Sequence, residues 1–248
     1  MSKKFLISLQ HWDGDYEQSK ELLELFADTI EENNPWADLC VFTRFDSKPM
    51  PEELILRLQK VFSNVWEKKS KTVASGWPNG CNAMWHDLAM VAYTNSTQSS
   101  FGEPEWEKYK AVFSIESDCC PLTKDWLRDL SMAWDKYDTN FIGAWSWNND
   151  DHNRIPECVG HINGNAMWAI DLVRKCPSLI GTPHAKGWDT WHAPELRKCG
   201  WQGAYEIRNM YNTQEISRET INHLISEGAA FLHGVKDGSA RAIYLSRK

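Results

Sequence analysis

The sequence predicts an α/β fold: a mostly parallel, twisted sheet with helices on both faces, followed by a smaller and irregular lobe. Over the first 145 residues, apolar runs of strand length alternate with stretches whose apolar residues recur at helical spacing. The later residues are less regular and richer in Gly, Pro, Trp and His. No internal repeat and no segment of linker composition interrupts the chain. We therefore expect a single domain over residues 1–248, with one half at 1–145 and the other at 146–248.

The expected elements follow one another along the chain. The strands are short apolar runs at residues 3–10, 39–45, 71–75, 111–115 and 141–145. The helices have apolar residues on one face and run from an Asp15 cap toward Pro35, from Pro51 through Val65, from Cys81 to Tyr93 and around Trp126 to Trp134. Because ligands bind beyond the carboxyl ends of the strands in such sheets, the residues after each strand are the candidate site.

Composition and charge narrow the function classes. The 248 residues are 42% hydrophobic and 25% charged, which is ordinary for a soluble globular protein, and no apolar run approaches the roughly 20 residues that cross a bilayer. The seven cysteines include no C-x-x-C pair, which favours reduced buried thiols over a zinc site or a disulfide framework. We expect a cytoplasmic protein (of a host cell, if the source is viral) without a membrane partner.

The net charge of −7 argues against nonspecific coating of nucleic acid. Residues 172–201 nevertheless carry five basic and two acidic side chains. This stretch is either a modest basic patch or a scatter of solvated charges.

Two acids end the apolar strand in "AVFSIESDCC". Glu116 and Asp118 stand one residue apart at its carboxyl end. Carboxylates so placed repel each other unless a cation or a ligand's hydroxyl groups lie between them. Asp118 could instead cap a helix over the following "PLTKDWL".

The order of these segments resembles that of the GT-A fold glycosyltransferases, which use nucleotide-sugar donors. The resemblance extends from Lys4 to Arg241 and rests on "FLISLQ", "GWPNGCN", "ESD", "HINGNAMWA" followed by "GWDTW", and "FLHGVKDGSAR". "ESD" stands where the family has its DxD motif, with Glu116 in place of the first Asp. The resemblance implies that residues 1–145 bind the nucleotide sugar and that 146–248 contribute the acceptor side and close the metal site.

The resemblance also implies roles for individual residues. Asp118 and His233 would bind a divalent cation, Mn²⁺ or Mg²⁺, which stabilises the leaving diphosphate. Lys236 would contact the diphosphate, and Glu116 the ribose or sugar hydroxyls. The other expected contacts with the nucleotide or donor sugar are Gln10, His11, Asp46, Trp77, Asn82, Asn163, Gly164 and Asn165. A hydrogen-bonded structural histidine is the alternative for His233.

An inverting transfer also needs a base for the acceptor hydroxyl. Asp189 in "GWDTWHAPEL" is our candidate, because the start of a helix favours an ionised carboxylate, and Glu195 is the reserve. A plain helix cap is the alternative for Asp189. Five tryptophans of the second half could stack on sugars or bases, although core packing is the default: Trp145, Trp147, Trp168, Trp188 and Trp191.

The sequence thus predicts a metal-dependent hexosyl- or pentosyltransferase that uses a nucleotide-sugar donor, with UDP as the expected nucleotide. The acceptor could be a hydroxymethylated pyrimidine in DNA, by functional analogy with viral DNA-modifying glycosyltransferases, or else a glycan, a protein or a small molecule. A sugar nucleotidyltransferase is disfavoured, because "QHWDGDY" is acidic where that class needs a Gly-rich basic loop. A non-catalytic sugar-binding protein remains an alternative.

Overall fold

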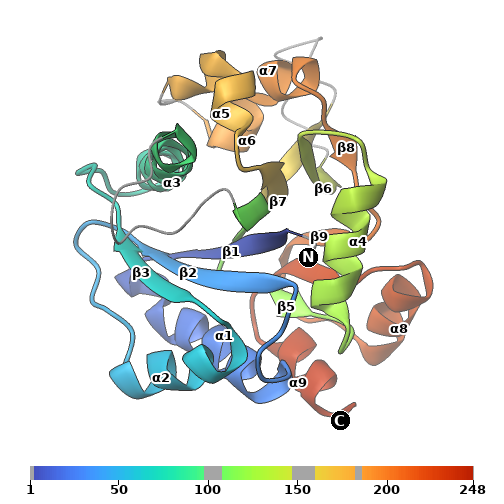
Figure 1. Cartoon of the computed structure of the whole chain (residues 1–248). Helices are drawn as coiled ribbons and strands as arrows, with labels where there is room; N and C mark the ends of the chain where they lie inside the picture. Colours follow the sequence, from blue (N-terminus) through green and yellow to red (C-terminus); the bar gives the residue numbers. More distant parts are fainter. Residues whose placement is uncertain (1–2, 98–107, 147–159, 182–185, 248) are drawn as a thin grey trace.

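A computed structural model describes residues 3–97, 108–146, 160–181 and 186–247, and its core is one large sheet (Figure 1). Within the described residues, this sheet has seven strands in the order β3-β2-β1-β4-β7-β6-β8. Strands β1, β2, β3 and β4 run parallel, whereas β7 is antiparallel to both of its neighbours, β4 and β6. The prediction of a mostly parallel sheet is confirmed. The strands are β1 (Lys4–His11), β2 (Ala37–Thr43), β3 (Val65–Lys69), β4 (Tyr109–Ile115), β6 (Phe141–Ser146), β7 (His161–Ala169) and β8 (Gln202–Gly203).

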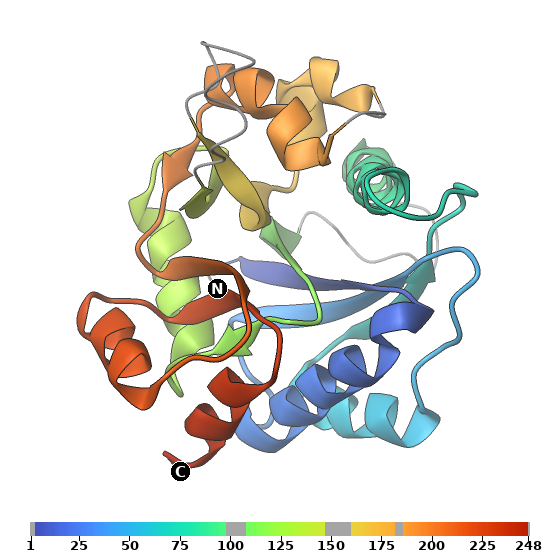
Figure 2. The same ribbon diagram turned by 180° about the vertical axis from the view of Figure 1, so that it is seen from behind.

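Side-chain alternation along the strands gives the sheet two apolar faces. In β1, Phe5, Ile7 and Leu9 enter one core cluster, whereas Leu6 enters the other. The first face is covered by α1 (Tyr16–Thr29), α2 (Glu52–Val61) and α4 (Trp126–Lys136). The second face is covered by α3 (Asn79–Thr97), α5 (Leu172–Lys175), the 3₁₀ turn η4 (Pro177–Ile180), α6 (Trp188–Trp191) and α7 (Ala193–Lys198), which lie on the same side of the sheet in Figures 1 and 2.

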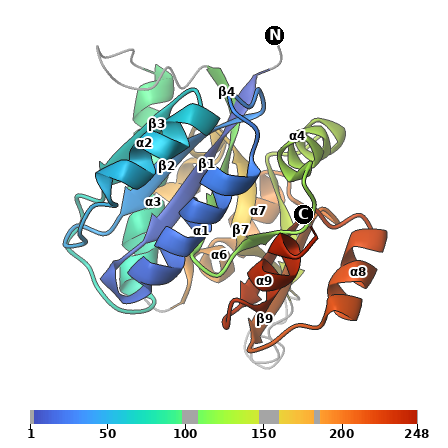
Figure 3. The same ribbon diagram turned by 90° about the horizontal axis from the view of Figure 1, so that it is seen from below.

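A smaller sheet lies against the first face of the large one. Its order is β5-β10-β9, formed by β5 (Cys120–Pro121), β9 (Ile207–Thr213) and β10 (Phe231–Val235). Phe231 joins it to the main core, with its ring centroid 4.9 Å from that of Phe113 and 5.0 Å from that of Trp126. Two further helices are α8 (Arg218–Ser226) and α9 (Ser239–Leu245), and α9 lies beside α1 (Figures 2 and 3). Segments from opposite ends of the chain therefore meet at the loop after β4.

Several expected element bounds are wrong. The third strand is not at 71–75 but at Val65–Lys69, because α2 ends at Val61 and the chain turns back to pair with the outer edge of β2. Residues 70–72 form a polar turn instead, in which Ser70 and Thr72 donate hydrogen bonds to Asp87. Helix α1 ends at Thr29, well before Pro35, and α3 continues past Tyr93 to Thr97.

The expectation that all cysteines are reduced and buried is also wrong. Cys176 and Cys199 form a disulfide, and Cys81 is exposed. The disulfide joins the end of α5 to the end of α7. Its two cysteines are 23 residues apart in the sequence, and their spacing did not predict that they pair. None of the helices in the described ranges is both long and apolar enough to cross a lipid bilayer.

Candidate active site

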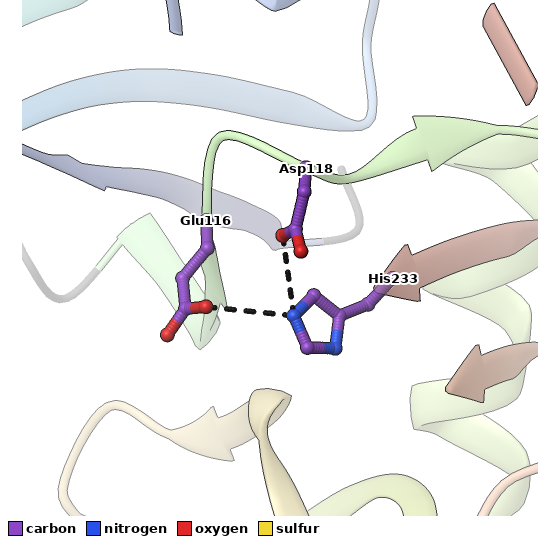
Figure 4. Close-up of side chains that lie close together, drawn as sticks. All are labelled: Glu116, Asp118 and His233. Carbon is purple, nitrogen blue, oxygen red and sulfur yellow. Dashed lines mark ion pairs between the residues drawn. The ribbon is translucent and has the colours of Figure 1, made fainter. Parts of the chain in front are cut away.

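Two acids and a histidine converge at the carboxyl end of β4 (Figure 4). Glu116 and Asp118 follow β4, and His233 projects from the middle of β10. The His233 Nε2 atom lies 3.2 Å from Asp118 Oδ1 and 3.4 Å from Glu116 Oε2, and one ligand atom of each residue lies within 4.8 Å of the others. Asp118 and His233 are nearly buried, whereas half of Glu116 is exposed. Such a cluster has the ligand types and spacing of a divalent-cation site.

Neighbouring groups fix the orientation and charge of this cluster. Asn209 Oδ1 lies 3.0 Å from His233 Nδ1, so Nε2 is the nitrogen that faces the acids. Lys236 donates to the second oxygen of Asp118. Burial alone would raise the pKa of Asp118, but His233 and Lys236 outweigh it and hold that pKa well below its usual range. Burial lowers the pKa of His233, but the carboxylates of Asp118 and Glu116 reverse this effect and raise the pKa to about 9.

The predicted segment around Asn163 and Asn165 lies directly against the acidic loop. The Asn165 Oδ1 atom accepts a hydrogen bond of 2.8 Å from the backbone N–H of Glu116 and one of 3.1 Å from the Cys119 thiol. Asn163 Oδ1 accepts in turn from the backbone and side chain of Asn165. Asn165 thus holds the acidic loop in place from β7, a role that leaves it buried rather than facing solvent.

Asp189 lies against the same strand. Its Oδ2 atom accepts a 3.0 Å hydrogen bond from the backbone N–H of Gly164 and lies 3.6 Å from His161 Nε2, while Oδ1 accepts from Thr190 N–H at 2.9 Å. Gly187 is the cap residue of the four-residue helix α6, and Asp189 sits inside the helix rather than capping it. Burial raises the pKa of Asp189, with Glu116 adding to the effect, so the helix terminus is not the main influence on its charge.

Gly164 is needed for close packing. A Cβ atom at this position would lie 3.1 Å from the ring of Trp188. Trp188 itself stacks on Trp85 of α3, with ring centroids 4.3 Å apart and planes 9° from parallel. The absence of a side chain at Gly164 therefore allows β7 and α6 to pack closely together.

Other predicted residues have different surroundings. Asp46 is exposed and accepts two hydrogen bonds from the guanidinium of Arg44, which lies over the ring of Trp12. Trp77 is 75% exposed on the turn before α3. Asn82 is buried and donates to the carbonyl of Lys186. These three stay predictions as donor contacts.

The first strand places its two predicted residues differently. His11 is buried at the end of β1 with its ring centroid 6.1 Å from that of Tyr16, and burial lowers its pKa. Gln10, the preceding residue, is half-buried and points to the opposite face of the sheet. At most one of them can face a ligand on a given side.

The capping alternative for Asp118 is wrong, because β5 follows it and α4 starts only at Trp126, after Asp125. The reserve base Glu195 lies on the surface, where it pairs with Lys198 and Ser178. Among the tryptophans, Trp168 and Trp188 are core residues, Trp145 and Trp191 are partly exposed, and Trp147 lies outside the described residues.

Four residues of the site were not predicted as site residues. Asp15 accepts a hydrogen bond from Ser117 in the acidic loop, and Arg241 donates to the Ser117 and Cys119 carbonyls from α9. Asn209 supports His233, and His161 faces Asp189. Their contacts depend on pairing between distant segments. His161 and Arg241 do lie within quoted segments, as the first residue of "HINGNAMWA" and the last of "FLHGVKDGSAR", but the sequence assigned them no role.

Comparison with known proteins identifies the fold. No protein-family model matches the chain, and no curated protein sequence is significantly similar to it. Among solved structures, S. aureus TarS 1–349 superposes with a TM-score of 0.56 at 10% identity, covering 93% of this chain and 60% of TarS 1–349. The same TarS fragment in complex with UDP-GlcNAc gives a TM-score of 0.53 at 11% identity, covering 96% and 60% of the two chains.

Two further structures agree. Mouse xyloside xylosyltransferase 1 gives a TM-score of 0.51 at 10% identity, with 94% of this chain and 98% of that one covered. The bifunctional glycosyltransferase WbbM gives 0.56 at 9% identity, with 94% and 46% covered. The chain thus spans about 60% of the length of TarS 1–349 and nearly all of the xylosyltransferase. It has the GT-A fold, as the order of its segments predicted.

Proposed function

We propose that this chain, which has the fold of the GT-A glycosyltransferases, is a metal-dependent transferase that moves a sugar from a UDP-sugar to an acceptor hydroxyl. The observation that carries the proposal is the position of the Glu116–Asp118–His233 cluster. It lies at the carboxyl end of a central parallel strand, the edge at which open α/β sheets bind ligands. The likeness to TarS in complex with UDP-GlcNAc supports UDP as the nucleotide.

The residues of the cluster fit a divalent cation. Asp118 Oδ1 and His233 Nε2 are buried and form an ion pair at 3.2 Å, and within the described part of the chain neither makes a hydrogen bond of good geometry. A cation would satisfy both atoms. Glu116, Asp118 and His233 would hold it, and their mixed oxygen and imidazole donors suit Mn²⁺ and, less well, Mg²⁺. When bound, it would neutralise charge on the leaving diphosphate, a contribution of several kcal/mol at the transition state.

Lys236 extends the positive charge of the site. Its ammonium pairs with Asp118, and both residues line a cavity of about 220 Å³ that also contacts Gln18, Glu21 and Arg241. A lysine beside a metal-binding carboxylate can turn to a phosphate oxygen once a cation takes over the carboxylate. This supports Lys236 as a contact to the diphosphate.

Asp189 is the base of the proposal. The charge of Glu116 contributes to the raised pKa of Asp189, which supports a position near the acidic loop. An ionised carboxylate with a raised pKa accepts a proton more readily than an ordinary one. In an inverting transfer, Asp189 would take the proton of the acceptor hydroxyl as its oxygen attacks the anomeric carbon.

The acceptor is proposed only as a hydroxyl-bearing molecule. Most basic residues of the 172–201 stretch have local partners: Arg174 pairs with Asp171, Lys198 with Glu195, and Arg197 lies over Trp201. This pairing favours scattered surface charge over a phosphate-binding patch. Hydroxymethylated DNA therefore enters as one acceptor to test, beside glycans, proteins and small molecules.

The test is donor turnover. Purified protein is incubated with UDP-glucose, UDP-galactose, UDP-GlcNAc and UDP-xylose in Mn²⁺, and UDP release is measured with and without excess EDTA. Parallel reactions contain hydroxymethylated or unmodified DNA, which is digested to nucleosides for mass spectrometry. We expect EDTA-sensitive UDP release from at least one donor. Binding of a donor without any release would show a sugar-binding protein instead, and no binding at all would refute the proposal.

A further inference from the structure

His161 has surroundings that suggest more than packing. It is the first residue of β7 and pairs with Ser146 at the end of β6, on the same edge of the sheet as Glu116. The residue is 6% exposed. One ring nitrogen, Nε2, lies 3.6 Å from Asp189 Oδ2, and the other, Nδ1, is buried without a hydrogen-bond partner among the described residues.

The Asp189 carboxylate is held from two elements at once. Gly164 N–H of β7 and Thr190 N–H of α6 donate to its two oxygens, and His161 approaches the oxygen that Gly164 already contacts. Burial raises the pKa of Asp189, and His161 is the foremost influence that lowers it. Without the nearby imidazole, a carboxylate that is only 17% exposed would take up a proton more readily and lose its capacity to act as a base.

We propose that His161 is a positioning residue for Asp189, with its Nε2–H directed at Oδ2 so that the carboxylate stays ionised and in one orientation. The inference rests on the proposed function. In the transfer step, the acceptor O–H bond breaks as its proton moves to Asp189. The acceptor oxygen bonds to the anomeric carbon, and the bond from that carbon to the diphosphate breaks, its electron pair leaving with UDP. His161 gains and loses no proton in this step.

Two substitutions separate this role from packing. His161→Gln keeps an N–H donor, whereas His161→Leu keeps the approximate volume and removes the donor. His192→Leu is the matched control: His192 is also buried, and its Nε2 lies 3.1 Å from the Gly181 carbonyl oxygen rather than near Asp189. The charged or titratable groups around the His161–Asp189 pair are Glu116 after β4 and Cys81 on α3, and neither is altered.

The measurement is UDP release from UDP-GlcNAc, or from the best donor of the panel, between pH 5.5 and 9. For His161→Leu we expect the acid limb of the pH profile of kcat/KM to move to higher pH by about one unit. At pH values below that limb, kcat/KM should then be about tenfold lower than in wild type, since one pKa unit is a factor of ten. The loss should shrink at pH 9, and KM for the donor should change little. His161→Gln should keep most of the activity, and His192→Leu should keep the wild-type profile shape.

The outcomes are distinguishable. A wild-type acid limb in His161→Leu, or a loss that is uniform across pH, would reduce His161 to packing and overturn the inference. If the wild-type protein releases UDP from no donor, the proposed function itself has failed. The contact can then still be tested by ¹⁵N NMR of the His161 ring at a fixed pH: we expect the proton on Nε2, and a change in the Nε2 chemical shift in Asp189→Asn. A proton on Nδ1 alone, or an Nε2 signal that Asp189→Asn leaves unchanged, would refute the contact.

Discussion

At the scale of single residues, Asp118 has the most constrained position in the site. Its side chain is 3% exposed, and both of its oxygens face cationic or ligand-type groups, His233 on one side and Lys236 on the other. Asp125, seven residues after Asp118, is 43% exposed and pairs with Arg128 at 3.2 Å, away from the cavity that Asp118 and Lys236 line. Asp118 and Asp125 therefore form a matched pair for testing the metal assignment.

We predict that Asp118→Asn loses about 10²–10³-fold in Mn²⁺-dependent donor turnover, the usual cost of removing one stabiliser of a developing anion. Asp125→Asn should remain close to wild type. The measurement is the initial rate of UDP release at saturating Mn²⁺, with circular dichroism to check folding. A wild-type rate in Asp118→Asn would rule out this carboxylate as a metal ligand.

Asp15 makes a second residue-scale prediction, which concerns stability. Burial raises the pKa of Asp15 to about 6, although Trp12 N–H and Ser117 donate to it. The pKa of Asp15 is higher in the folded state than in the unfolded state, so protonation of Asp15 stabilises the folded state below about pH 4. This stabilisation is lost as pH rises through 6. Asp15→Asn should thus raise the free energy of unfolding by up to about 2–3 kcal/mol at pH 7.5 and by much less at pH 4.

Urea unfolding at the two pH values measures this difference. Asp13→Asn, at an exposed position on the same turn, is the control and should show no such pH dependence. An equal effect of Asp15→Asn at pH 4 and pH 7.5 would contradict the account.

At the scale of elements, α9 holds the acidic loop in place. Arg241 donates from α9 to the carbonyls of Ser117, Cys119 and Gln18, so one guanidinium joins α9, the loop after β4, and α1. The carboxylate of Glu21 on α1 adds an ion pair at 3.3 Å. The orientation of Glu116 and Asp118 therefore depends on a residue more than a hundred positions later in the chain.

We predict that Arg241→Met destabilises the fold by about 2–4 kcal/mol, because it leaves carbonyl groups of the loop without their charged donor. We also expect Mn²⁺ binding to weaken about tenfold through loss of loop order. The surface pair of Arg57 with Asp28 provides the control, since Arg57→Met should cost no more than about 1 kcal/mol. Unchanged stability and metal affinity in Arg241→Met would mean that the loop is ordered by its own turn.

Strand prediction from sequence succeeded where a strand was buried on both sides and failed where it was not. Strands β1, β2, β4 and β6 are apolar runs in the sheet interior, and each was expected close to its observed place. The edge strand β3, with sequence "VWEKK", is partly exposed and polar. Its order of apolar and polar residues could equally belong to the last turn of the preceding helix. Its identity depends on pairing with β2, a long-range contact.

At the scale of the whole molecule, the site is assembled from both ends of the chain. Glu116 and Asp118 come from the first half, whereas His233 lies on β10 of the small sheet and Lys236 directly follows that strand. The sequence predicted these four because they fall within segments whose order is typical of the fold. It did not predict Asn209, His161 or Arg241, because their roles arise from contacts between β9 and β10, β7 and α6, and α9 and the acidic loop.

The most direct test of the central claim is calorimetric titration of the protein with UDP, with and without Mn²⁺. The account predicts that UDP binds with micromolar-range affinity in Mn²⁺, that EDTA weakens binding at least tenfold, about 1.4 kcal/mol, and that Asp118→Asn in Mn²⁺ behaves like the wild-type protein in EDTA. Asp125→Asn should bind like wild type. UDP binding of equal strength with and without Mn²⁺, unchanged by Asp118→Asn, would contradict the claim that Glu116, Asp118 and His233 form the metal centre of a nucleotide-sugar site.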